Sequence, residues 1–369
     1  MSLKKITAPF YERLSLVLVG LIALVYLVIL GKELLDPLIF GFLFAILLLP
    51  LASAFERKLR FPRALSSFLS IVLLIAFIYG IFYLVGSQIS KLASDWPMLK
   101  SQVSQSIDDL SAWIQNAFSI NATRQATIVN NTKNQIMSSG SSVLGETFGA
   151  ISSLMLFYLF ILIFTFFILL YRRLLLRFIV WVFNEDNAPV VFDVVENIQS
   201  ILRQYILGLL LEMLVVSCLA CSVFWFIGVK YALLLGILVG LFNLIPYLGI
   251  FTALLLSGLI AFATGTLAQA VWVVSSVLGI HLLDSNILLP TIVGSKVKLN
   301  ALVTFLGIIL GEMIWGLSGM FLSIPVIAIM KIIFDRVESL KPWGYLLGSG
   351  QEDQKSAVKK MKPATLDKT

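Results

Sequence analysis

Fifty consecutive residues without a charged side chain or a histidine decide the fold class of this chain. Residues 231–280 read YALLLGILVGLFNLIPYLGIFTALLLSGLIAFATGTLAQAVWVVSSVLGI. A helix needs about 20 apolar residues to cross the roughly 30 Å hydrocarbon core of a bilayer, so the stretch is long enough for two passages. Its middle carries Asn243, Pro246, Tyr247 and Gly249, where proline removes a backbone hydrogen bond and glycine permits unusual torsions. The stretch therefore predicts a membrane segment that is broken at 243–249.

The whole chain has the composition of an integral membrane protein. Of its 369 residues, 59% are hydrophobic and 13% are charged, whereas soluble domains hold about 45–50% apolar and about 25% charged residues. Such a chain has too little polar surface to cover a globule in water, which excludes soluble enzymes, fibres and disordered proteins. The net charge of +7 does not indicate nucleic-acid binding, because the basic residues lie between apolar stretches and not along one face.

The apolar segments predict an all-α, polytopic membrane fold with about eight spans. Two long segments, 231–265 and 299–331, contain Gly and Pro and are expected to be broken, tilted or re-entrant, because a straight helix over 299–331 would extend about 50 Å. Eight crossings, or six crossings plus two re-entrant hairpins, both fit the pattern, and eight is the prediction. The six simpler spans are 14–31, 37–55, 65–86, 150–171, 205–229 and 268–290.

Lys and Arg flank these spans unevenly, and cytoplasmic loops are the ones enriched in them. With a cytoplasmic N-terminus, nineteen of the 27 basic residues fall on the cytoplasmic side. The pattern predicts that both termini are cytoplasmic and that the first span is retained, since no cleavage site follows it.

Residues 87–147 are predicted to lie outside the cytoplasm. Apolar residues recur at steps of three and four from Ile89 to Phe118, which predicts an amphipathic helix that packs on protein, and a polar loop follows it. The predicted organisation has five parts: 1–86 (three membrane helices), 87–147 (this region), 148–204 (the fourth span and a cytoplasmic connecting helix), 205–335 (a membrane core broken at 243–249 and 311–319) and 336–369 (a basic cytoplasmic tail).

Enzyme motifs do not explain the chain. It has no Walker-type phosphate loop, and its single histidine excludes an H-E-x-x-H zinc site. Cys218 and Cys221 lie in an apolar segment and are read as two small hydrophobic residues. Ser318, in a G-x-S-G stretch, could pair with His281 in an intramembrane protease, but rhomboid-type proteases have these residues in the opposite order. We therefore predict no enzyme activity, no cofactor and no metal site.

Ionisable groups inside the spans are candidates for a transport pathway, because a charge at the bilayer centre costs at least about 2.5–3.5 kcal/mol. For each of them, a structural hydrogen bond between helices is the alternative. The candidate pathway residues are Glu212, Asn243, Pro246, Tyr247, Gly249, Asp284, Asn286 and Glu312. Small-residue spacings predict close helix packing or hinges at Gly236, Gly240, Gly307, Gly311, Gly316, Gly319 and Pro325.

Several motifs in the second half resemble the autoinducer-2 exporter (AI-2E) family, also called PerM-like permeases. They are, in the order of the family, Tyr205-Ile-Leu-Gly208, Gly228-Val-Lys-Tyr231, Asn243-Leu-Ile-Pro246-Tyr247-Leu-Gly249, Asp284-Ser-Asn286-Ile-Leu-Leu-Pro290, Val293-Gly294-Ser-Lys296 and Gly316-Leu-Ser-Gly319 through Pro325. The ending Lys341-Pro342-Trp343-Gly344 looks like Bacteroidetes-type members. Many members carry Gln or a small residue where His281 stands, which argues against a family-wide role for this histidine.

The resemblance implies a secondary transporter of the bacterial cytoplasmic (inner) membrane. The family includes proteins described as exporters of autoinducer-2 and others described as sodium or lithium/proton antiporters. The expected substrate is therefore a small hydrophilic solute or a monovalent cation, with Glu212 and Glu312 as candidates to carry a coupling proton or cation. The expected partners are the lipid bilayer and possible copies of the same chain. A membrane scaffold without transport activity is the alternative.

Overall fold

The computed structural model describes residues 10–95, 101, 105, 155–183, 187–245, 248–292 and 299–348. These residues are helical almost throughout, and the described part of the chain contains no strand beyond an isolated bridge between Leu299 and Gly348. The predicted all-α polytopic membrane fold is confirmed. Six described helices are long and apolar enough to cross a membrane: Lys32–Lys58, Arg63–Leu92, Met155–Val182, Ala188–Ile227, Leu267–Ile292 and Leu317–Arg336. The predicted amphipathic helix lies largely outside the described residues.

The N-terminal half is built from α1 (Phe10–Leu30), α2 (Lys32–Lys58), α3 (Arg63–Ser94) and the helix Met155–Val182. Helix α2 begins five residues before the predicted span at 37–55 and continues through Pro37. The reason is the turn at Gly31, whose carbonyl oxygen accepts hydrogen bonds from the amides of Leu34 and Leu35 and so starts a new helix directly after α1. The residues expected to form a short loop are therefore the first turn of α2.

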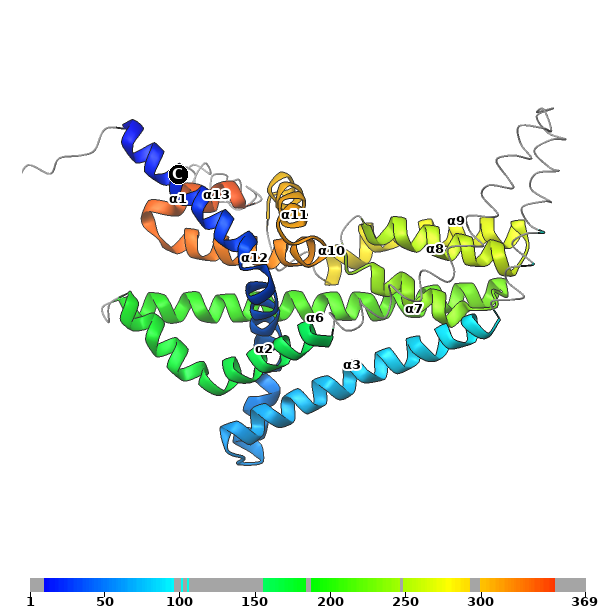
Figure 1. Cartoon of the computed structure of the whole chain (residues 1–369), viewed down its shortest axis with the longest axis horizontal. Helices are drawn as coiled ribbons and strands as arrows, with labels where there is room; N and C mark the ends of the chain where they lie inside the picture. The colour runs from blue at the N-terminus through cyan, green and yellow to red at the C-terminus, as the bar shows by residue number, and fades with distance from the viewer. Residues whose placement is uncertain are drawn as a thin grey trace, which may run out of the picture.

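Helix α6 (Ala188–Ile227) is the axis of the molecule. It runs along the longest dimension, and α2 crosses it near its middle (Figure 1). Its 40 residues extend about 60 Å, roughly twice the hydrocarbon thickness. The helix passes without a break through 204–205, where a connecting helix was expected to join the membrane core.

A tight turn at the end of α6 leads into α7 (Ala232–Phe242), which packs against α6. The turn uses Gly228 in the left-handed conformation (φ 78°, ψ 29°), which costs glycine little. Gly236 approaches Cys221 and Gly240 approaches Ser217 so closely that a Cβ atom at either glycine would overlap with α6.

The same turn is tied to the end of α3. The Lys230 Nζ atom lies 2.8 Å from Asp95 Oδ2, and the Tyr231 hydroxyl donates a hydrogen bond of 2.6 Å to the same oxygen. Hydrogen bonds from Lys230 and then Tyr231 lower the pKa of Asp95, and the bond to Asp95 raises the pKa of Lys230. We call these three residues the α3 clasp.

The chain breaks after α7, as its Asn-Pro-Gly pattern predicts. Helix α7 ends at Phe242, residues 243–245 form a turn, and α8 (Leu248–Thr264) leads back along α7 (Figure 1). A Cβ atom at Gly249 would collide with the carbonyl oxygen of Phe242, so only glycine permits the two arms to meet there. The eleven residues of α7 extend about 16 Å, about half of the hydrocarbon thickness.

Helix α9 (Leu267–Leu283) begins with a capping box formed by Thr266 and Gln269 and changes geometry at its end. Asp284–Leu288 form a π-helix, η2, which leads into the short α10 (Leu289–Ile292). Pro290 explains the change, because proline has no amide hydrogen for a bond to Asn286 and its ring would clash with that carbonyl in a regular α-helix. Short π-helices inside α-helices are found mostly at functional sites.

The last part of the membrane core is a second helical hairpin, α11 (Ala301–Trp315) and α12 (Leu317–Arg336). Gly316 joins the two helices with φ 67° and ψ −138°, a conformation available essentially only to glycine. The backbones of Gly311 and Gly319 touch directly, and the Ser323 hydroxyl donates to the carbonyl of Gly307 at 2.8 Å. A 3-10 turn η3 (Glu338–Leu340) and α13 (Lys341–Leu347) end the described chain.

Candidate functional site

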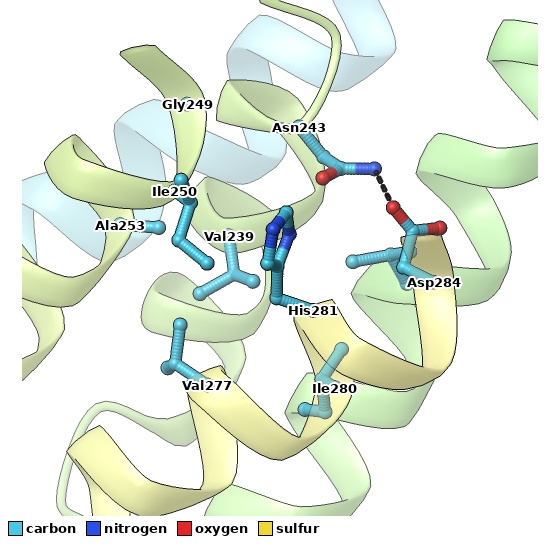
Figure 2. Close-up of a pocket in the computed structure, with 10 residues that line it drawn as sticks. Val239, Asn243, Gly249, Ile250, Ala253, Val277, Ile280, His281 and Asp284 are labelled. Carbon is cyan, nitrogen blue, oxygen red and sulfur yellow. Dashed lines mark hydrogen bonds between the residues drawn. The ribbon is translucent and has the colours of Figure 1, made fainter. Parts of the chain in front are cut away.

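Three predicted pathway residues meet at a single point. The Asn243 side-chain amide nitrogen donates to Glu212 Oε1 and to Asp284 Oδ2, each at 3.1 Å. Glu212 is 3% exposed and Asp284 is 4% exposed. The bond between Asn243 and Asp284 is visible in Figure 2. We call this arrangement the carboxyl–amide bridge, because one amide links two buried carboxyl groups that come from separate helices.

Each member of the bridge is placed by a local feature of the sequence. Glu212 continues the buried stripe of α6, which includes Tyr205, Leu209 and Val216 at helical spacing. Asn243 is the first residue after α7, where the helix stops and the side chain is free to point away from the helix axis. Asp284 is the first residue of the π-helix, and it is buried. A helix, a helix end and a helix irregularity thus converge.

The bridge leaves polar atoms without partners. A side-chain amide has two N–H donors, so Asn243 has none left once both carboxyl groups are served. Glu212 Oε2, Asp284 Oδ1 and His281 Nδ1 are buried and have no hydrogen-bond partner in the described part of the chain. Buried polar atoms are nearly always satisfied in native proteins. These three atoms are therefore positioned to hold a proton, water or a bound solute.

The two carboxyl groups also act on one another. Their side chains lie close enough for a direct hydrogen bond between Glu212 and Asp284. Two ionised carboxylates at such separation repel each other strongly in a buried site, and a proton held between them removes the repulsion. The geometry is suited to binding and releasing a proton.

A cavity of about 640 Å³ opens beside the bridge. It is bounded by α6, the tip of the α7–α8 hairpin, the junction of α9 and η2, and the hairpin of α11 and α12, and much of its wall is apolar. No Lys or Arg is among the described residues that line it. Its polar lining consists of Tyr205, Glu212, Asn243, His281, Asp284, Ser285 and Thr304.

A second hollow, of about 10 Å³ and therefore of the size of one water molecule, adjoins the bridge on the side of α8. Gly249, Ile250 and Ala253 form one wall, and Val277 and Ile280 of α9 form another (Figure 2). His281 extends from α9 toward the Asn243 side chain and lines both spaces. Sequence reasoning considered this histidine only as a protease base.

Two other predicted pathway residues lie apart from the bridge. The Asn286 side chain is exposed and donates to the carbonyl oxygen of Leu282 in its own helix, at 2.7 Å. Glu312 is exposed on α11. Gly249 lines the small hollow, whereas Pro246 and Tyr247 lie outside the described residues.

Sequence reasoning missed a second buried acid. Asp36 on α2 is 4% exposed and forms a hydrogen bond with Ser318, just beyond the hinge at Gly316. On the other side of the hinge, Trp315 Nε1 donates to the carbonyl oxygen of Val28 at 3.1 Å. The α11–α12 hinge is therefore docked on the junction of α1 and α2. Ser318 has a structural partner in Asp36, a simpler explanation than a nucleophile.

The sequence profile of the family described as "AI-2E family transporter" matches residues 16–339. The chain belongs to the AI-2E transporter family. The match includes both hairpins and every member of the carboxyl–amide bridge. The family resemblance stated from the motifs is confirmed, and the chain is a multi-pass membrane protein of a transporter family.

Individual relatives agree with the family assignment. The AI-2 transport protein TqsA of Escherichia coli (strain K12) is 25% identical over 308 residues, which is 83% of this chain and 87% of that protein. Two relatives bear the name "Putative transport protein". One, from Haemophilus influenzae, is 26% identical over 88% of this chain and 92% of its own length. The other, YrrI of Bacillus subtilis (strain 168), is 35% identical over 137 residues, 37% of this chain and 38% of that relative.

Proposed function

We propose that this AI-2E family member is a proton-coupled secondary transporter of the bacterial inner membrane, with both termini in the cytoplasm. The carboxyl–amide bridge is the coupling site, and the adjoining cavity is the solute site. One observation carries the proposal: two buried carboxyl groups from separate helices share one amide at the break of a membrane segment, beside a space large enough for a small solute. Interrupted apolar segments are the typical place of transporter binding sites.

Buried acids that served only as structure would be expected to have their oxygen atoms satisfied by protein donors. Here one oxygen of each acid has no protein partner in the described chain and faces its counterpart. A proton can be held between the two groups in one conformation and released when a cation or water reaches them in another. The bridge therefore supports coupling between proton movement and solute movement.

The short α7 favours a re-entrant hairpin for 231–265. A helix that extends about 16 Å reaches roughly the middle of the hydrocarbon, which is where the hairpin would place Asn243. Backbone that is not helical is tolerated at this depth only when protein or a water-filled cavity surrounds it. The cavity next to Asn243 meets that requirement.

Reconstituted protein tests the proposal. Solute-driven proton flux is measured in proteoliposomes that contain a pH-sensitive dye, over a panel of small solutes and monovalent cations. Glu212→Gln keeps the shape of the side chain and fixes it in a neutral form, so flux should lose its dependence on the proton gradient. Glu312→Gln is the matched control, since it makes the same chemical change on the exposed face of α11. Gradient-dependent flux that survives both Glu212→Gln and Asp284→Asn would refute the coupling role of the bridge.

A further inference from the structure

We propose that the cavity binds a small organic cation with one ammonium group, held by Glu212 Oε2 and Asp284 Oδ1. This inference rests on the proposed function and names the substrate class of the same site. It starts from the two oxygen atoms that the carboxyl–amide bridge leaves without a partner.

The charge of the cavity selects against anions. Its described lining contains two acidic side chains and one histidine, and no Lys or Arg to balance them. A buried carboxylate without a counter-charge is costly, and a bound cation removes that cost. Even when one proton is held between the two acids, one negative charge remains. A carboxylate or phosphate solute would meet this charge with no compensating group among the described lining residues.

The hydrogen-bonding atoms call for a donor-rich solute. Glu212 Oε2 and Asp284 Oδ1 can only accept hydrogen bonds while they are ionised. An ammonium group has three donors and no acceptor, so it can serve both oxygens and keep one donor for His281 Nδ1 or water. A neutral alcohol has one donor and would leave one of the carboxyl oxygens unpaired.

Size and wall chemistry favour an organic cation over a bare metal ion. An alkali ion must exchange its hydration shell for a ring of protein oxygens. No group of three or more His, Cys, Asp or Glu that could hold a metal occurs among the described residues. The volume of about 640 Å³ falls within the range of roughly 300–1,000 Å³ that is common for small-molecule sites. The apolar wall, with Leu209, Ile250 and Ile308, is suited to the hydrocarbon part of such a solute.

The same geometry explains exchange. The ammonium and the coupling proton need the same carboxyl oxygens, so binding of one displaces the other. Ammonium binding should therefore release a proton from the bridge, and the transporter should act as an antiporter of protons and organic cations.

Binding measurements on the purified full chain in nanodiscs test this inference. Isothermal titration calorimetry compares n-butylammonium with its uncharged analogue n-butanol and its anionic analogue butyrate, in potassium phosphate buffer. We expect n-butylammonium to bind at least ten times more tightly than either analogue, and sodium chloride not to displace it. Equal affinity for butyrate or n-butanol, or displacement by sodium at millimolar concentration, would overturn the inference.

Variants locate the site. Asp284→Asn should weaken n-butylammonium binding at least tenfold, whereas Glu312→Gln should leave it unchanged. Size-exclusion chromatography and circular dichroism confirm that each variant is folded. If Asp284→Asn does not fold, titrations of the unaltered protein at several pH values serve instead, because affinity should rise with pH as the competing proton is lost. Affinity that does not change with pH would contradict the shared site. Gradient-coupled flux of other solutes without ammonium binding would refute the substrate class alone and leave the proposed function intact.

Discussion

Replacing Asn243 by leucine removes both hydrogen bonds of the carboxyl–amide bridge at nearly constant side-chain size. Hydrogen bonds between helices in membranes contribute about 0.6 kcal/mol on average and at most about 1.7 kcal/mol, because the unfolded chain in the bilayer also finds partners. The two bonds of Asn243 therefore predict a loss of roughly 1–3 kcal/mol of unfolding free energy. Bonds to charged groups in water-soluble proteins, at about 1.5–3 kcal/mol each, set the upper limit.

Steric trapping in bicelles measures this free energy in a lipid environment. Asn286→Leu is the matched control, because Asn286 is exposed and bonds within its own helix, so its replacement should cost less than about 0.5 kcal/mol. In a Glu212→Gln background the cost of Asn243→Leu should fall by about half, since the glutamine amide can itself donate to Asp284. Equal costs for Asn243→Leu and Asn286→Leu, or strict additivity with Glu212→Gln, would refute the reasoning.

Three further predictions concern the backbone and the clasp. Gly249→Ala should destabilise the α7–α8 hairpin by about 1–3 kcal/mol, because the new Cβ would overlap with the Phe242 carbonyl, whereas Gly279→Ala has open space and should be neutral or stabilising in a thermal melt. Gly316→Ala should cost about 1–3 kcal/mol from its positive φ, and an equal effect from Gly20→Ala, which meets no neighbour, would show that the hinge conformation is not the cause. The α3 clasp should hold from mildly acidic to mildly alkaline pH, because the lowered pKa of Asp95 keeps its contribution until the pH falls through that lowered value, and the raised pKa of Lys230 keeps its contribution until the pH rises above it. Hydrogen exchange of residues 228–232 should therefore show constant protection across that range and lose it in Asp95→Asn, while unchanged protection in Asp95→Asn would show that the clasp does not hold the turn.

Much of the fold could be predicted from the sequence, because glycine and proline act locally. The breaks at 243–249 and at Gly316 follow from torsions and missing amide hydrogens that belong to those residues alone. The convergence of Glu212, Asn243 and Asp284 was within reach for a related reason, since a polar group in an apolar segment must find a partner.

Other parts of the site depend on tertiary structure and could not be predicted. Asn286 follows Asp284 by two residues and looked equally suited to the pathway, but the π-helix turns it outward. Glu312 lies in an apolar segment, yet its face of α11 packs on none of the described helices closely enough to bury it. Asp36 looked like part of a loop because it precedes a proline, and only the packing of α12 on α2 shows that it is buried.

The π-helix at Asp284–Leu288 places α9 and α10 one residue out of phase. A deletion of one residue within it would let regular helix continue, and everything beyond the deletion would rotate by about 100° relative to α9. His281, before the irregularity, would keep its direction, while Leu289 would turn out of the cavity wall. The two ends of this segment thus work like the two scales of a vernier. Their offset sets which side chains face the solute, and length variation at this one point would change selectivity without any substitution in the cavity itself.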